Sequence, residues 1–353
     1  MYPKEDWDMK NVFDLPDGIE YLRTSGKKVL LYGMGNGGEK AYSLLTSRGI
    51  EVAGVFASDG FVRGHSFLGY PVLSLSAAEE IYGDFIAVLS FALEGRKADI
   101  LERVTAKHHL YTPYMAVCGE GVTDKQTVLQ SREDIEKVYS LLADDTSRRI
   151  YENAIAYCIT GDISYLKHTE GDDTPPDGYF RDDGTYIDVG AYNGDTAQEY
   201  IEKAPDVPEM ICFEPDVRSY NKMLKRELNN LTAFNAAAGR RDGETTFSGG
   251  GGRSSSTGKG KITVAVKSID SVAAEKNVAC IKIDAEGDER EVLAGAANTI
   301  WKHSPALNVS LYHRTGDLWE LPLLLHRVNS KYKLYIRKKE YVPMWDISVY
   351  CMP

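Results

Sequence analysis

The sequence predicts an α/β protein with two Rossmann-like domains, and three observations lead to this prediction. Apolar runs of strand length alternate with helical patterns in both halves of the chain, which indicates mostly parallel sheets. A glycine-containing turn follows the first strand of each half, at Gly33–Gly38 and at Gly190–Gly194. The 353 residues suit two domains. We therefore expect domains at 1–118 and 179–353, joined by a helical connector at 119–178.

The first domain begins as a nucleotide-binding unit does, with a buried strand, a glycine turn, a helix and a second strand. The helix runs to about Arg48. Expected strands are Lys28–Tyr32, Glu51–Phe56, Pro71–Leu73 and Phe85–Ser90, with a helix at Ala77–Tyr82. The connector carries helical periodicity from about Ser131 to Lys167, and Glu133 near its start suits the positive end of a helix dipole.

The second domain is predicted to form a mostly parallel sheet that ends with an antiparallel strand. Its expected parallel strands are Thr185–Val189, Met210–Phe213, Thr232–Asn235, Ile262–Val266, Ala279–Ile283 and Leu307–Tyr312. Only a turn separates Tyr332–Lys338 from Ile347–Tyr350, so these two should pair antiparallel, because a parallel pair needs a long crossover.

Composition excludes several classes of protein. The net charge of -11 argues against a nucleic-acid partner, which requires clustered Lys and Arg. No segment approaches the roughly 18 apolar residues of a membrane span, so no membrane partner is expected. The first residues resemble no secretory signal, and we expect a cytoplasmic location. Five scattered cysteines form no CxxC pair, and Cys212 and Cys280 suit buried strands. The oligomeric state stays open, a homo-oligomer included.

A glycine-rich segment at 248–261, SGGGGRSSSTGKGK, is the one low-complexity stretch. It departs from the phosphate-binding P-loop because Gly260 follows Gly258-Lys259 where Ser or Thr is required. A flexible surface loop is the favoured interpretation, and a mobile lid over a substrate pocket is the alternative.

Four motifs in the second half fall where strands end, which is where ligands bind in open α/β sheets. Ile187–Thr196 reads IDVGAYNGDT, and its glycines allow a ligand to approach the backbone closely. Phe213–Asp216 reads FEPD and places Glu214 where an acid accepts hydrogen bonds from ribose hydroxyls. Small residues at Asn235–Ala238 leave room for a flat adenine ring. Ile281–Ala296 reads IKIDAEGDEREVLAGA.

These motifs resemble the FkbM family of class I methyltransferases, over roughly Tyr179 to the C-terminus. The resemblance implies a class I methyltransferase sheet, S-adenosylmethionine as cofactor, and methylation of a hydroxyl on a saccharide or related small molecule. It also implies the cofactor-binding residues. Glu214 would hold the ribose and Ala237 would lie near adenine, and the set implied around the cofactor is Asp188, Gly190, Ala191, Asn193, Gly194, Thr196, Glu214, Pro215 and Ala237. The chain departs from the family wording at Tyr192 and at Tyr312-His313.

Methyl transfer is chiefly a matter of positioning, and a base near the methyl group helps because a protonated alcohol is a poor nucleophile. Asp284, Glu286 and His313 are the candidate catalytic residues, since they should lie at neighbouring strand ends. A structural histidine is the alternative for His313. We expect no metal ion; Mg²⁺ held by Asp284 and Glu286 is the less favoured alternative, because such acids also cap helices.

The first half offers a competing hypothesis. Gly33, Gly35 and Gly38 satisfy GxGxxG, and Asp59 lies about where a ribose-binding acid belongs. A structural or partner-binding domain, nucleotide-sugar recognition and redox use of NAD are all left open for it. For the whole chain, the alternatives to a methyltransferase are a sugar-modifying protein that binds NAD or a nucleotide sugar, and a non-catalytic cofactor-binding protein.

Overall fold

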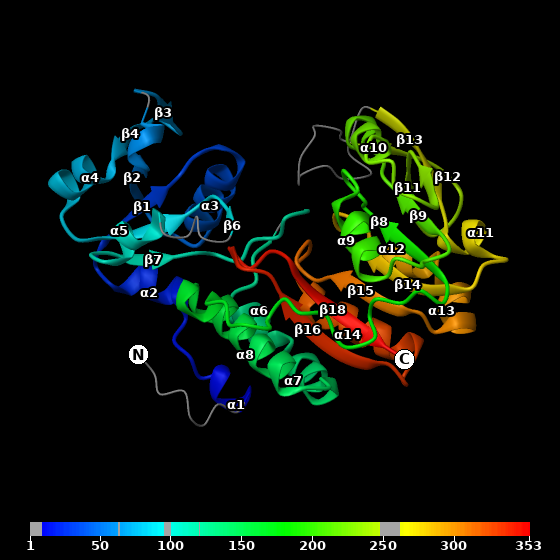
Figure 1. Cartoon of the computed structure of the whole chain (residues 1–353). Coiled ribbons are helices and arrows are strands. Elements are labelled where there is room, and N and C mark those ends of the chain that lie inside the picture. Colours follow the sequence, from blue (N-terminus) through cyan, green and yellow to red (C-terminus); the bar gives the residue numbers. More distant parts are fainter. Residues whose placement is uncertain (1–8, 63, 95–99, 120, 248–261) are drawn as a thin grey trace.

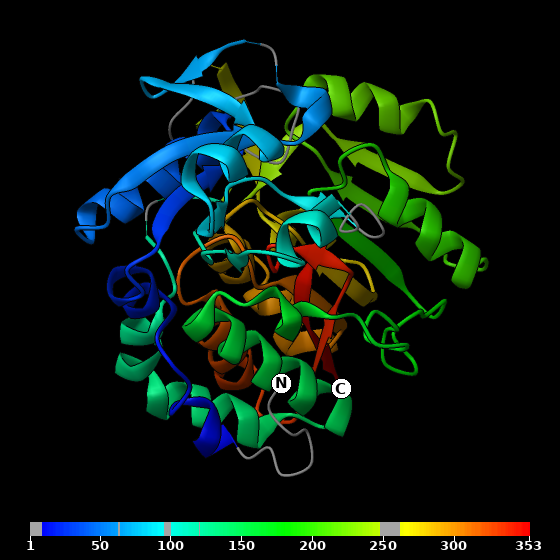
Figure 2. The same cartoon turned by 90° about the vertical axis from the view of Figure 1, so that its left-hand side faces the viewer.

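The computed structural model describes residues 9–62, 64–94, 100–119, 121–247 and 262–353. Two sheets stand side by side above a layer of connecting helices (Figure 1). The view turned by 90° likewise places the connecting helices below both sheets (Figure 2). The glycine-rich segment at 248–261 lies outside the described residues.

The N-terminal sheet has six strands in the order β3-β4-β2-β1-β5-β7. All neighbours are parallel except β3 and β4, which form a hairpin. The strands are β1 (Lys28–Tyr32), β2 (Val52–Ala57), β3 (Ser66–Phe67), β4 (Tyr70–Ser74), β5 (Phe85–Leu89) and β7 (His109–Tyr111). The helices are α1 (Met9–Val12), α2 (Gly18–Thr24), α3 (Gly35–Ser47), α4 (Leu75–Tyr82) and α5 (Glu102–Thr105), with a 3-10 turn η1 (Asp59–Phe61).

The connector consists of α6 (Lys125–Gln130), α7 (Arg132–Leu141), α8 (Asp145–Thr160) and a 3-10 turn η3 (Ile163–Leu166). The helical stretch expected from Ser131 to Lys167 is broken at Asp144. This residue has extended backbone, and its carboxylate accepts the amide of Ser147 at 2.7 Å, so it caps a new helix. Ten of the sixteen residues of α8 are buried, because it packs against α6 and the strand β16 (Lys333–Lys338). The connector is therefore part of the core.

The C-terminal sheet has seven strands in the order β10-β9-β8-β14-β15-β18-β16. The parallel strands are β8 (Thr185–Val189), β9 (Met210–Phe213), β10 (Leu231–Phe234), β14 (Val278–Ile283) and β15 (Ala306–Ser310). The last strand, β18 (Ile347–Met352), runs antiparallel to both of its neighbours and lies between β15 and β16. The expected pairing of these final strands is confirmed, as is the predicted α/β architecture with two Rossmann-like domains.

The helices of this domain are α9 (Asp195–Lys203), α10 (Val217–Leu224), α11 (Ile269–Ala273), α12 (Glu289–Ala294), α13 (Ala297–His303) and α14 (Asp317–Val328). The strand expected near Ile262 does not join the main sheet. It is β13 (Ile262–Lys267), which pairs with β11 (Ala236–Ala238) and β12 (Gly243–Phe247) in a separate small sheet. None of the helices in the described residues is long and apolar enough to cross a membrane. All five cysteines are free and buried, as expected for Cys212 and Cys280.

Two connections tie the N-terminal domain to the C-terminal domain. A short strand β6 (Leu93–Glu94) pairs antiparallel with β17 (Tyr341–Val342), which lies in the loop between β16 and β18. The segment around Cys118 contacts the end of β15, where the amide of Cys118 donates to the carbonyl of His313 at 2.9 Å. Lys40 of α3 supports this segment by donating to the carbonyl of Ala116 at 3.0 Å.

Candidate active site

A cleft of about 430 Å³ lies at the carboxyl ends of β8, β9 and β14. This is the edge at which ligands bind in parallel α/β sheets. Its lining residues come from all four sequence motifs: Val189, Gly190, Tyr192, Asp195, Thr196, Phe213, Glu214, Pro215, Asp216, Ser219, Ala237, Ala238, Phe247, Lys282, Asp284, Ala285, Glu286, Asp288, Tyr312, Lys339 and Asp346. The sheet topology therefore brings together segments that are distant in the sequence.

Gly190 forms the tight turn between β8 and α9. Its φ of +73° lies in the left-handed region, and a Cβ atom there would stand 1.9 Å from the carbonyl oxygen of Asp284. The amides of Gly190 and Ala191 both donate to the carbonyl of Phe213, at 3.1 and 3.0 Å. A side chain at position 190 would push the end of β8 away from the end of β14, which explains the glycine.

A buried ionic network lies under the cleft. Asp188 is completely buried, accepts a hydrogen bond from Thr196 Oγ1 at 2.5 Å, and pairs with Lys282 Nζ at 3.2 Å. Lys282 also donates to the carbonyl of Gly190 at 3.0 Å and lies 4.0 Å from Asp284. Burial lowers the pKa of Lys282, but the charges of Asp188 and Asp284 outweigh that effect and hold its pKa above the ordinary value. The lysine is therefore a fixed cation between two carboxylates.

Glu214 presents a buried carboxylate at the end of β9. One oxygen accepts the amide of Tyr192 at 2.8 Å and the other accepts the amide of Asp216 at 2.7 Å. Burial raises the pKa of Glu214 to about 7, although these hydrogen bonds oppose the rise. Asp216 itself caps α10 by accepting the amide of Ser219 at 2.9 Å. Each oxygen of Glu214 keeps acceptor capacity for a hydroxyl group in the cleft.

Part of the cleft lining is apolar. Ala237 and Ala238 belong to β11, and Phe247, at the end of β12, lines the same cleft. Pro215 lies on the same wall, where Asn235 holds the backbone by donating to the carbonyl of Pro215 at 3.1 Å. A flat apolar ring suits such a wall, since the side chains that face it are small or aromatic.

Four residues predicted to surround a cofactor lie outside the lining of the cleft. Ala191 is fully buried in the core beside α9. Asn193 accepts a hydrogen bond from Arg226 at 3.0 Å, and Gly194 packs against Met223. Asp188 lies beneath the cleft wall, whereas Gly190, Thr196, Glu214, Pro215 and Ala237 line the cleft directly.

The predicted catalytic residues do come together. His313 Nε2 is 3.4 Å from Asp284 Oδ1 and 3.4 Å from Glu286 Oε2, although these acids follow β14 and the histidine follows β15. His313 is completely buried, whereas the side chains of Asp284 and Glu286 are 29% exposed and line the cleft. A fourth residue, Glu289, accepts from His313 Nδ1 at 2.7 Å.

The charge of His313 follows from these neighbours. Burial lowers its pKa, but the carboxylate of Glu289, helped by Asp284 and Glu286, raises the pKa of His313 to about 10. Glu289 also accepts the amide of Ala285 at 2.9 Å, so this one buried acid holds both the ring of His313 and the loop that follows β14. The geometry places His313 behind the two carboxylates rather than in the cleft.

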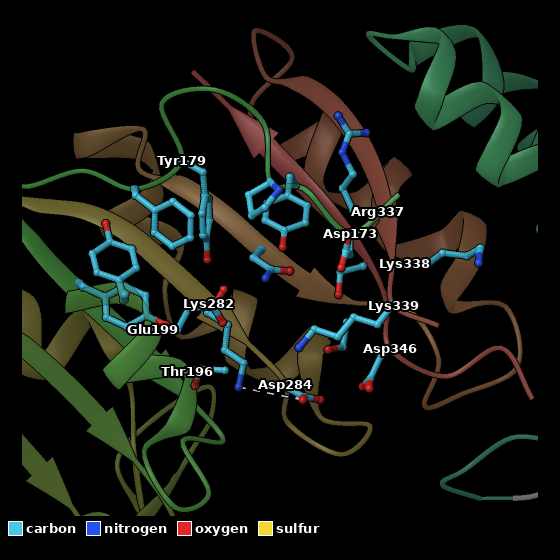
Figure 3. Close-up of a pocket in the computed structure, with 18 residues that line it drawn as sticks. Asp173, Tyr179, Thr196, Glu199, Lys282, Asp284, Arg337, Lys338, Lys339 and Asp346 are labelled. Atoms are coloured by element: carbon cyan, nitrogen blue, oxygen red, sulfur yellow. Dashed lines mark ion pairs between the residues drawn. The ribbon is translucent and has the colours of Figure 1, made fainter. Parts of the chain in front are cut away.

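A second, smaller cavity of about 130 Å³ adjoins the cleft on the face of the sheet beside α9 (Figure 3). The two cavities share five of their lining residues: Thr196, Lys282, Asp284, Lys339 and Asp346. Lys339 reaches into the smaller cavity, while Arg337 and Lys338 point away from its centre (Figure 3). One part of its wall is aromatic and consists of Tyr179, Phe180, Tyr186, Tyr200 and Tyr350.

The floor of this smaller cavity is polar, which is unusual for the face of a parallel sheet. Lys282 is in register with Asn308, and Asn308 with Tyr350, while Ser310 faces Ser348. Residues in register point to the same side of a sheet. The opposite face of the same strands is fully buried and apolar, with Ile281, Ile283, Leu307, Val309 and Val349. Polar residues on one face only indicate a binding surface.

Sequence reasoning missed four residues of this site. Lys282 and Glu289 stand inside the motif IKIDAEGDEREVLAGA, and a lysine in the middle of an apolar strand was a usable signal, because buried lysines are paired. Lys339 and Asp346 come from the loop between the final strands. No pattern in the sequence placed that loop at the cleft.

Two glycines of the N-terminal turn, Gly33 and Gly37, pack against the end of β5, whereas Gly35 faces open space. A Cβ atom on Gly33 would stand 2.5 Å from the Phe91 ring, and one on Gly37 would stand 2.0 Å from the Ser90 carbonyl oxygen. These glycines are therefore explained by packing against the end of β5. Asp59, the expected ribose-binding acid, pairs with Arg103 at 2.7 Å.

Comparisons with known proteins agree with the fold and the motifs. Residues 188–332 match the family model of the methyltransferase FkbM domain. The crystal structure of methyltransferase FkbM from Methylobacillus flagellatus KT is similar over 98% of this chain and 98% of its own, with 18% identity and a TM-score of 0.71. That likeness extends the shared fold to the N-terminal domain and the connector. Comparison with curated proteins finds no match.

Partial likenesses include two other solved structures. A putative rRNA-methylase from Clostridium thermocellum is 9% identical over 49% of this chain and 87% of its own, with a TM-score of 0.31. A SAM dependent methyltransferase from Aquifex aeolicus is 11% identical over 62% of this chain and 97% of its own, with a TM-score of 0.30. The family match at 188–332 covers the four motifs from Asp188 onward, and it confirms the resemblance seen in the sequence. The C-terminal domain of this chain is similar to the methyltransferase FkbM domain over residues 188–332.

Proposed function

We propose that this chain uses S-adenosylmethionine to methylate a hydroxyl group of a saccharide or a related small molecule. One observation carries the proposal: the cleft and the smaller cavity meet at Lys282 and Asp284. A donor in one cavity and an acceptor in the other would meet at that shared wall, which is the arrangement that a transfer reaction requires.

The residues of the cleft fit S-adenosylmethionine. Glu214 offers acceptor capacity to the ribose hydroxyls, and the small residues Ala237 and Ala238 leave room for the adenine ring. Gly190 lines the cleft at the first turn, where the methionine portion would meet the backbone. When bound, S-adenosylmethionine supplies an electrophilic methyl group.

The smaller cavity suits a polyhydroxylated ring. Its tyrosines offer ring edges and faces, while Asn308, Ser310 and Ser348 offer hydrogen bonds. Lys282 and Lys339 are the lysines of its lining that adjoin the cleft, and its lining carboxylates are Asp173, Glu199, Asp284 and Asp346. The combination of aromatic surface and paired polar groups supports a sugar over a purely apolar substrate.

The carboxylates of Asp284 and Glu286 would orient the acceptor hydroxyl and receive its proton as the carbon–oxygen bond forms. Lys282 keeps Asp284 ionised, because its charge helps to hold the pKa of that carboxyl below the usual range despite burial. His313 does not line the cleft, and we assign it a positioning role behind the two acids.

Calorimetric titration with S-adenosylhomocysteine, NAD and nucleotide sugars tests the cofactor. We expect binding of S-adenosylhomocysteine to the wild-type chain, and binding at least about tenfold weaker to Glu214→Gln, which loses a charge-assisted hydrogen bond. The Asp59→Asn variant changes the acid of the other glycine turn and serves as the control, with wild-type affinity. Binding of NAD alone would overturn the proposal.

Transfer of a radiolabelled methyl group onto a panel of glycans tests the acceptor. An Asn308→Ala variant should raise the acceptor KM while the affinity for S-adenosylhomocysteine stays the same, because Asn308 lines the smaller cavity and is absent from the lining of the cleft. Labelling of apolar alcohols in preference to every glycan would contradict the saccharide assignment.

A further inference from the structure

The cluster of Asp284, Glu286, Glu289 and His313 has a feature that acid clusters ordinarily lack. His313 is completely buried, and its Nε2 has no hydrogen-bond partner in the described part of the chain. The same atom points between two carboxylate oxygens, at 3.4 Å from each. A buried ring nitrogen without a partner is costly, so its position requires an explanation.

The two distances are those of ligands that share an ion. A hydrogen bond between nitrogen and oxygen has a length of about 2.7–3.2 Å, so Nε2 lies just beyond bonding distance of Asp284 and Glu286. Two atoms that each lie about 2.1 Å from one cation, at a near-tetrahedral angle, stand about 3.4 Å apart. Asp284 and Glu286 therefore each stand from Nε2 at the distance that separates two ligands of one small divalent cation.

Glu289 supplies the support that a histidine ligand needs. It is buried, and it accepts from His313 Nδ1 at 2.7 Å. A carboxylate that binds one ring nitrogen fixes the orientation of the ring and leaves the other nitrogen directed at the metal. Glu289 also accepts the amides of Ala285 and Gly287, at 2.9 and 3.4 Å, and thereby holds the loop that carries Glu286.

We infer that Asp284, Glu286 and His313 bind one divalent transition-metal ion at the wall of the cleft. One imidazole and two carboxylates suit the series from Mn²⁺ to Zn²⁺, whereas Mg²⁺ prefers oxygen ligands alone. Asp284 and Glu286 both line the cleft, so the remaining coordination positions face it. This assignment replaces the expectation of a metal-free site.

The ion's role rests on the proposed function, but its binding does not. In a methyltransferase, an ion at this wall would bind the acceptor oxygen and lower the pKa of the hydroxyl, because a metal-bound hydroxyl loses its proton more readily. The acceptor cavity shares Asp284 with the cleft, so its ligand reaches the same wall.

The test is metal binding by the full chain, without donor or acceptor. Protein treated with a chelator is titrated with Mn²⁺, Zn²⁺ and Mg²⁺ by calorimetry, and Mn²⁺ binding is followed independently by electron paramagnetic resonance. We expect one Mn²⁺ or Zn²⁺ ion per chain. The Glu286→Gln and His313→Gln variants should bind it at least tenfold more weakly. Asp195→Asn removes a carboxylate from the same cleft and should bind it as the wild type does.

Three results would overturn the inference: no ion bound by the wild type, equal binding by Glu286→Gln, or a preference for Mg²⁺ over Zn²⁺ and Mn²⁺. If His313→Gln fails to fold by circular dichroism, the partly exposed Glu286 and an Asp284→Asn variant decide the question. A chain that binds S-adenosylhomocysteine but no metal contradicts only this inference. A chain that binds the metal but not S-adenosylhomocysteine contradicts only the proposed function.

Discussion

Glu214 is the residue whose ionisation most directly links pH to ligand binding. Its pKa of about 7 is raised by burial, so at pH 6 most of the protein carries the neutral acid. If the ionised form is the one that accepts hydrogen bonds from ribose, affinity scales with the ionised fraction. We expect the affinity for S-adenosylhomocysteine to rise about tenfold between pH 6 and pH 8, measured by calorimetry.

The Glu214→Gln variant is the control for this dependence. It keeps the shape of the side chain but has no proton to lose in this range, so its weaker affinity should be nearly constant from pH 6 to pH 8. A wild-type profile that is equally flat would show that Glu214 is already ionised at pH 6, or that it makes no contact with the ligand.

Gly190 gives a second prediction at this scale. Replacing it with Ala adds left-handed strain of about 1–2 kcal/mol, and the new Cβ also meets the carbonyl of Asp284. We expect Gly190→Ala to lower the free energy of unfolding by more than 2 kcal/mol, well above its matched control, as measured in urea.

Gly35→Ala is that control, because Gly35 has a φ of +75° but no atom within 4 Å of the added Cβ. It should show the backbone strain alone, about 1–2 kcal/mol. An equal decrease in the free energy of unfolding of the two variants would mean that the turn at Gly190 accommodates the new Cβ without displacing Asp284.

Much of the cleft was predictable residue by residue, because acids and glycines at strand ends carry a local pattern. Glu214 and Asp284 were found in this way, and they line the cleft as the motifs suggested. Lys282 and Glu289 were not predicted as site residues, because their roles depend on partners across the sheet. Asn193 is the opposite case. It stands in a recognisable motif, but its side chain accepts a hydrogen bond from Arg226 and does not line the cleft.

Among the elements, the loop between β16 and β18 contributes to both cavities through Lys339 and Asp346. Its middle, β17, pairs with β6 of the N-terminal domain, with Val342 opposite Leu93. The N-terminal domain therefore holds one rim of the site. This contact gives the domain a structural role that needs no ligand in its glycine turn.

Replacing Leu93 with Pro should release this rim. Proline has no amide hydrogen and fits poorly in a strand pair, so we expect hydrogen exchange at 339–346 to speed up about tenfold, the effect of losing about 1.4 kcal/mol of backbone bonding. Leu93→Ala keeps the backbone and should exchange more slowly than Leu93→Pro. Unchanged exchange in Leu93→Pro would mean that the loop is held by its own domain.

Most strands were predictable because an apolar run between glycines or turns is a local signal. The exceptions have non-local causes. The strand near Ile262 was expected in the main sheet, but it pairs with β12 instead, since those two strands flank the glycine-rich segment at 248–261. The pairing of β6 with β17 joins two-residue strands from opposite ends of the chain, and no sequence pattern of that length is distinctive.

Across the whole molecule, the two sheets and the connector share one apolar core. Phe56 and Phe85 of the first sheet belong to the same buried cluster as Tyr157 of α8 and Leu307 of β15. The connector is the middle of this core, with Tyr157 in an edge-on contact with Tyr114. Domains joined by a continuous core unfold together, unlike domains joined by a linker.

We therefore expect a single calorimetric transition for the full chain, with equal van't Hoff and calorimetric enthalpies. A Tyr157→Ala variant should lower the midpoint without splitting the transition, because it leaves a cavity between the two domains. Two separate transitions in the wild type would show that the N-terminal domain folds independently.

The position of β18 has a consequence for how the protein is made. β18 lies between β15 and β16, although it is synthesised after both of them. While the ribosome is still extending the chain, β16 has no partner in the sheet and β15 presents an open edge. N-terminal domains can fold during translation, but this sheet is completed only after residues 347–352 have left the exit tunnel. The C-terminal sheet therefore depends on β18, and a nascent chain stalled before that point would expose an unpaired edge to aggregation or chaperone binding.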